Sequence, residues 1–101
     1  MKVNEFIIQG INKLVELFPQ TRISYQFDEI ASTHYIQIQP SEIYKEDQQY
    51  IAWEKKFYFD FIHNYPDQNI CFITDDAPFE MDDVNYDVMG SEYGPLIKSV
   101  H

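Results

Sequence analysis

The sequence predicts an α+β domain, with a small antiparallel or mixed sheet of three to four strands and two helices on one face. Apolar residues recur at helical spacing in two stretches, and two shorter stretches alternate apolar with polar residues, as strands do. The order along the chain is α-β-β-α-β, followed by a variable C-terminal segment. At 101 residues, the chain should form one domain over 1–101, because separate cores appear only at roughly twice this length.

The first helix is predicted over residues 3 to 18. Its apolar residues lie three and four positions apart: Val3, Phe6, Ile7, Ile11, Leu14, Val15 and Phe18. Pro19 should end it, because proline cannot donate a backbone hydrogen bond. Gly10 lies inside this helix, where glycine costs about 1 kcal/mol relative to alanine. We therefore expect another segment to pack closely against Gly10.

Two strands joined by a short connector are expected next. From Arg22, the residues Ile23, Tyr25 and Phe27 alternate with polar ones, and residues 33 to 39 repeat this alternation. The connector over residues 28 to 32 favours an antiparallel hairpin. In the second strand one face carries His34, Ile36 and Ile38. The other face of the sheet would present Ser24, Gln26, Tyr35, Gln37 and Gln39 to solvent or to a partner.

A second helix and a third strand complete the predicted core. Pro40 ends the second strand, and Ser41 or Asp47 could cap the helix after it. Aromatic residues at helical spacing predict this helix over residues 50 to 65: Tyr50, Trp53, Phe57, Phe61 and Tyr65. After a turn at residues 66 to 69, residues 70 to 74 are predicted to form a short buried strand.

Residues 75–101 form an acidic C-terminal segment, expected to be partly ordered. Between Asp75 and Glu92 there are seven acidic residues and no basic one. Interleaved apolar residues argue against plain disorder, and a weak strand is predicted near residues 84 to 88.

The charge of the chain limits its partners. Seventeen acidic residues against seven basic ones give a formal net charge of −10. This charge repels phosphate backbones and anionic lipid surfaces, so we expect no binding to nucleic acid or to membranes. A basic protein is the partner that the charge favours.

Cysteine content and hydropathy favour a cytoplasmic location. The chain has one cysteine, Cys71, so it cannot form an intramolecular disulfide. Its start lacks the apolar core of a signal peptide, and no stretch approaches the roughly 20 apolar residues of a membrane span. Because its neighbours are apolar, Cys71 is predicted to be an inert core residue.

The residue pattern predicts that the protein is not an enzyme. The three histidines lack metal-ligand spacing, the glycine-rich and Cys-x-x-Cys motifs are absent, and Asp28 and Glu29 are typical of a turn. We therefore predict no catalytic residue, no protein metal ligand and no cofactor. The alternative is a protein that binds a small ligand or divalent metal through the 75–83 acidic loop, or through His34 with Asp28 and Glu29.

Eight tyrosines exceed what so small a core accommodates, because each buried hydroxyl needs a hydrogen-bond partner. Exposed tyrosines among acidic residues are typical of protein-binding surfaces. The predicted partner-binding residues are Tyr35, Gln37, Asp75, Asp76, Glu80, Asp82, Asp83 and Tyr86.

Several strings between residues 14 and 76 resemble a group of small bacterial proteins with no established activity. They are Ile23-Ser24-Tyr25-x-x-Asp28-Glu29, then Thr33-His34-x-Ile36 with Pro40, then Tyr50, Trp53-Glu54 and Phe61, and finally Ile70-Cys71-Phe72-Ile73. The resemblance implies no ligand residues. In size and charge, the chain is also similar to the immunity proteins that neutralise bacterial toxins, which is an analogy of type.

The leading hypothesis is therefore a non-enzymatic, acidic protein-binding module, such as an immunity or inhibitor protein for a basic partner. A homodimer, built through the aromatic helix or the edge of the sheet, is compatible with this hypothesis and with the ligand-binding alternative.

Overall fold

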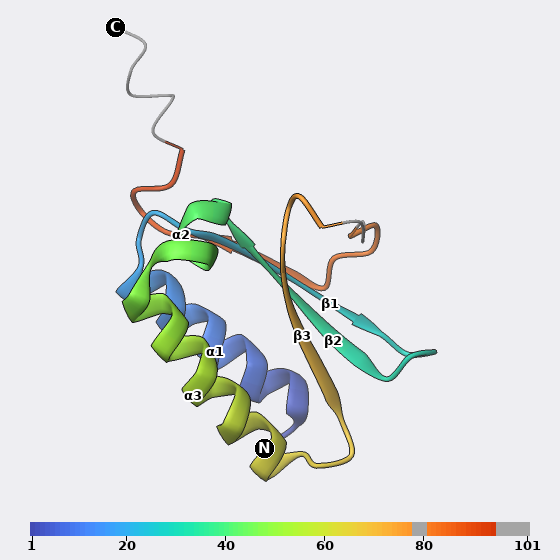
Figure 1. Cartoon of the computed structure of the whole chain (residues 1–101). Helices are drawn as coiled ribbons and strands as arrows, with labels where there is room; N and C mark the ends of the chain where they lie inside the picture. The colour runs from blue at the N-terminus through green and yellow to red at the C-terminus, as the bar shows by residue number, and fades with distance from the viewer. Residues whose placement is uncertain (78–80, 95–101) are drawn as a thin grey trace, which may run out of the picture.

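The computed structural model describes residues 1–77 and 81–94. Its elements are α1 (Val3–Leu17), β1 (Arg22–Asp28), β2 (Thr33–Gln39), α2 (Ser41–Glu46), α3 (Gln48–Asn64), β3 (Asn69–Thr74) and β4 (Tyr86–Met89). Figure 1 shows α1 and α3 side by side along one face of a twisted sheet. The predicted α+β class, with two helices on one face, is confirmed.

The sheet has four strands in the order β3-β2-β1-β4. β1 pairs with both β2 and β4 in antiparallel fashion, whereas β2 and β3 are parallel, so the sheet is mixed. The register places Ile23 opposite Ile38 and Tyr25 opposite Ile36, as the alternation of apolar residues requires. The predicted antiparallel hairpin of β1 and β2 is therefore confirmed.

The core lies between the helices and the sheet. Its buried apolar residues come from α1, α3, β1, β2 and the turn after α1: Ile7, Ile11, Leu14, Phe18, Ile23, Tyr25, Ile36, Ile38, Tyr50 and Phe61. The prediction of close packing at Gly10 is also confirmed. A Cβ atom on Gly10 would lie 2.2 Å from Cε1 of Phe57, so the missing side chain lets α3 approach α1.

The N-terminal end of α3 matches a cap that the sequence suggested. The Asp47 carboxylate accepts hydrogen bonds from the backbone N–H groups of Gln49 (2.9 Å) and Tyr50 (3.1 Å), so Asp47 is the N-cap. The short helix α2, Ser41–Glu46, was not predicted, because it has only six residues and buries none of them.

The prediction that Cys71 is a buried core residue is wrong, since its side chain is exposed. β3 is an edge strand, and successive side chains of a strand point to opposite faces. Ile70 and Phe72 therefore pack toward the helices, while Cys71 lies on the other face of the sheet, which we call the open face.

Both described ends of the connection from β3 to β4 lie against the open face. These two parallel strands lie at opposite edges of the sheet, and residues 75–77 and 81–85 are the described parts of the connection between them. The described parts of this connection contact open-face residues at both of its ends. Gln39 donates to Asp75 (3.1 Å), and Gln26 donates to Asp82 (3.2 Å). The helices thus cover one face (Figure 1), and acidic residues of the connection contact the other.

Candidate functional site

The tip of the β1–β2 hairpin is held by its own polar groups. Oδ1 of Asp28 accepts hydrogen bonds from the N–H groups of Ile30 (3.0 Å) and Ala31 (3.2 Å), as expected of an aspartate in a turn. Ser32 closes the turn with φ at 51°. This arrangement leaves the Ile30 side chain 99% exposed at the tip.

Gln26 fixes the end of the β3–β4 connection to the open face. Its side-chain N–H donates to Asp82, and its carbonyl accepts from the backbone N–H of Asp83 (3.0 Å). Asn85 continues this attachment, since its backbone N–H donates to the Tyr25 carbonyl and its side-chain oxygen accepts from the Phe27 N–H (both 2.8 Å). Gln26 is consequently buried although it lies on the open face.

An open groove of about 720 Å³ lies between the hairpin tip and this segment. We call it the acidic groove. It is lined by Gln26, Phe27, Asp28, Glu29, Ile30, Asp82, Asp83 and Asn85. Four of these residues carry carboxylates and none is basic, so the groove favours a cationic occupant. Ile30 adds an exposed apolar side chain to its lining.

Asp75 and Asp76 lie away from this groove, at the start of the same connection. Asp75 accepts from Gln39, and Asp76 pairs with the Lys45 ammonium on α2 (2.8 Å). Hydrogen bonding to Lys45, and also to the Thr74 hydroxyl, lowers the pKa of Asp76. The negative charge of Asp76 is therefore already balanced by the Lys45 ammonium. Glu80 lies outside the described residues.

The predicted tyrosines do not share one surface. Tyr35 and Gln37 lie half-buried on the open face, as the strand alternation predicted. Tyr86 instead lies on the helix side, where its hydroxyl donates to Oδ1 of Asn12 in α1 (2.7 Å). Of the predicted partner-binding residues that the structure describes, only Asp82 and Asp83 line the acidic groove. The sequence analysis did not single out Ile30, and it gave Asp28 and Glu29 a turn role or, in the alternative, a ligand site with His34.

His34 is a core residue. It is 1% exposed and stacks on Phe27 at a ring-centroid distance of 4.4 Å. Its Nδ1 lies 2.7 Å from the Tyr25 hydroxyl, and its Nε2 lies 2.6 Å from Oε1 of Gln68. Because an amide oxygen can only accept, Nε2 carries the proton and Nδ1 accepts from Tyr25. Burial lowers the pKa of His34 and raises that of Tyr25 to about 12, so both stay neutral at pH 7.

The alternative site of His34 with Asp28 and Glu29 is not assembled. Asp28 lies on the open face and caps the hairpin turn, whereas His34 faces the helices. Within residues 1–77 and 81–94, no three His, Cys, Asp or Glu side chains are grouped so that they could hold a metal ion. In the same part of the chain, no helix is long and apolar enough to cross a membrane.

The fold and this surface define a small α+β domain with a mixed four-strand sheet and an acidic groove on its open face. Comparisons with models of protein families, with curated proteins and with solved structures find no match to this chain. The resemblance to small bacterial proteins therefore stays a prediction.

Proposed function

We propose that this chain is a non-enzymatic binding module, in the cytoplasm, for a basic protein. An immunity or inhibitor protein that covers a cationic site is the form of this proposal that the charge favours. The observation that carries it is the acidic groove, where two segments more than 50 residues apart in sequence bring four carboxylates together around the exposed Ile30.

Charge and apolar surface have different roles in this proposal. The carboxylates attract a basic partner over distances of about one Debye length, roughly 10 Å at 0.1 M salt. Ile30 then supplies a side chain that a partner can bury, since binding energy concentrates in desolvated contacts near the centre of an interface. Complex formation should therefore be fast at low salt and weaken as salt is added.

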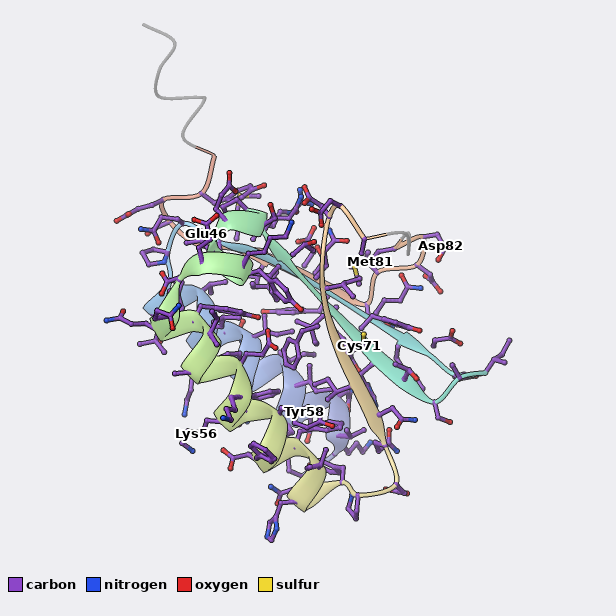
Figure 2. The ribbon with its side chains drawn as sticks, in the orientation of Figure 1. Glu46, Lys56, Tyr58, Cys71, Met81 and Asp82 are labelled. Atoms are coloured by element: carbon purple, nitrogen blue, oxygen red, sulfur yellow. The ribbon has the colours of Figure 1, made fainter. Side chains whose placement is uncertain are left out.

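A charge-neutralising variant tests the groove. Asp82→Asn with Asp83→Asn removes two charges but leaves an oxygen at position 82 that can still accept from Gln26. The matched control, Glu16→Gln with Glu46→Gln, removes two charges from exposed helix positions far from the groove; Figure 2 shows Glu46 on α2. Each chain is used to capture proteins from native lysate at low salt, and the captured partner is then titrated by calorimetry.

We expect the natural chain and the control to capture a basic protein that the groove variant binds about tenfold more weakly, a loss of about 1.4 kcal/mol. Equal binding by all three chains would place the interface elsewhere. Capture of an acidic protein, or of none at all, would contradict the proposed function.

A further inference from the structure

β3 is the strand at one edge of the sheet, and the direction of its backbone groups follows from one hydrogen bond. The Asn69 N–H donates to the Ser32 carbonyl (3.3 Å). In a parallel ladder, alternate residues direct both backbone groups to the neighbouring strand. The odd-numbered residues of β3 therefore face β2, while Ile70, Phe72 and Thr74 direct their N–H and C=O groups outward. The Phe72 carbonyl agrees, since it accepts from the Tyr44 hydroxyl (3.1 Å).

This outer edge is only partly satisfied. The Thr74 carbonyl accepts from the Ala77 N–H (3.2 Å), and Tyr44 reaches the Phe72 carbonyl. Within the described chain, no hydrogen bond involves the outward groups of Ile70 or the outward N–H of Phe72. Proteins commonly protect such edges with charged residues or proline, but β3 contains neither over Asn69–Thr74.

A strip of exposed apolar side chains on α3 lies beside this edge. Ile51 is 38% exposed and Tyr58 is 41% exposed, and a spacing of seven residues puts both on the same side of the helix. Figure 2 shows Tyr58 on the side of α3 toward β3. α3 packs on β3 through Phe57 and Phe72, whose ring centroids lie 6.3 Å apart. The strand edge and these two side chains thus lie on one surface. Between Ile51 and Tyr58, α3 also carries the exposed Lys55 and the half-buried Glu54, which have opposite charges.

We propose that two copies of this chain associate through this surface, with their β3 strands paired antiparallel and their α3 helices in contact beneath them. A two-fold interface must be complementary to itself. A chain of charge −10 repels its own copy at charged surfaces. β3 carries no charge, and on α3 the half-buried Glu54 accepts from the Tyr50 hydroxyl and has the oppositely charged Lys55 next to it. This surface can therefore meet a second copy of itself with less repulsion than the acidic surfaces of the chain.

The outward backbone groups of β3 that have no partner within the described chain also determine the register of the proposed pairing between the two copies. Because Ala77 occupies the Thr74 carbonyl, the pairing that uses the remaining groups sets Ile70 opposite Phe72 of the second copy. The Phe72 carbonyl can accept from both Tyr44 and the second copy, since it has two lone pairs. Cys71 then lies on the two-fold axis opposite its own equivalent. Residues paired in this way have Cα atoms about 4.5 Å apart, which lies within the range that a disulfide spans, about 4.4–6.8 Å.

Cysteine cross-linking of the natural chain tests this register. Diamide, which accepts two electrons and two protons from a pair of thiols, is added to the purified chain in about 0.5 M NaCl, where charge repulsion is screened. We expect a covalent dimer joined through Cys71, visible on a non-reducing gel and reversed by dithiothreitol. Sedimentation equilibrium without oxidant should show a mass that rises toward the dimer with concentration, and more so at high salt, because salt screens the repulsion between the chains.

A substitution on the helix strip tests whether this surface, and not another, mediates self-association. Tyr58→Glu adds a charge at the two-fold contact and should weaken self-association about tenfold or more, since burying an unpaired charge is costly. Leu17→Glu, at an exposed position on α1, is the matched control and should leave association within about twofold. A chain that stays monomeric at high salt would overturn the proposal, as would a dimer that neither cross-links nor responds to Tyr58→Glu. Added salt should weaken the proposed binding of a basic partner, so failure of one proposal is distinguishable from failure of the other.

Discussion

The two faces of the sheet differ in how they satisfy their polar groups. The face under the helices is aromatic, and its few polar side chains bond to one another, as in the path from Tyr25 through His34 to Gln68. The open face is polar, and its Gln39 and Gln26 side chains bond to Asp75 and Asp82 at the two described ends of an acidic connection. The difference indicates that stability resides mainly on the helix face, and that the open face is available for binding.

We expect the largest change in the free energy of unfolding at α3, where a buried phenylalanine can be compared with an exposed one. Phe61 is fully buried, whereas Phe59, two residues earlier, is 54% exposed. Phe61→Ala should lower the free energy of unfolding by about 3–5 kcal/mol, because it removes a buried ring and leaves a cavity. Phe59→Ala should change it by about 0.5 kcal/mol or less. Urea denaturation of both variants measures this, and equal losses would contradict the assignment of the core.

Gly10→Ala tests the close approach of the two helices. Helix propensity alone predicts a gain of about 1 kcal/mol. The new methyl group would instead meet the Phe57 ring at 2.2 Å, and overpacking typically costs about 1–3 kcal/mol. We expect a net loss of stability in urea denaturation. Combining Gly10→Ala with Phe57→Leu should recover part of this loss, and a stabilised single variant would show that α3 does not contact α1 at this point.

Gln26→Ala tests how much the contacts on the open face contribute to stability. The substitution removes a side chain that holds both Asp82 and the Asp83 N–H, so we expect a loss of about 1 kcal/mol. Hydrogen exchange should accelerate at Asp83 and Asn85 while the amides of α1 and α3 keep their protection. Faster exchange throughout the helices would contradict the separation of the two faces.

Acid should destabilise the helix face gradually through His34. Its folded-state pKa lies below the ordinary value near 6.5. Between those two values the unfolded chain binds more protons than the folded chain, so stability falls as the pH decreases below about 6.5. Burial raises the pKa of Glu54, and this effect has the opposite sign. His34→Gln should therefore flatten the fall in unfolding free energy between about pH 7 and pH 5. An unchanged pH dependence would contradict the role given to His34.

The fold could be predicted where residue periodicity is strong. The helical spacing of α1 and α3 and the alternation of β1 and β2 are local signals, and the structure confirms all four elements. The weak strand predicted near residues 84 to 88 exists as β4 at Tyr86–Met89. α2 was missed because six residues give too few turns for a periodic signal.

The site could be predicted only in part, because it depends on contacts between distant segments. The acid-rich stretch identified Asp82 and Asp83. Their place beside Asp28 and Glu29 follows from the pairing of β4 with β1, and no local pattern specifies the partner of an edge strand. Cys71 was misassigned for the same reason. An apolar run such as Ile70 to Ile73 fits a fully buried strand or an edge strand equally well.

The late position of β4 in the chain has a consequence for the order of folding. β1 and β2 are neighbours in sequence and can pair as soon as both are synthesised, whereas the Arg22–Asp87 pair closes a span of 65 residues. Contacts at such separations form late, because the entropy of the intervening chain must be lost first. The acidic groove therefore comes into being only when this last strand docks, so a nascent or partly folded molecule does not yet present it.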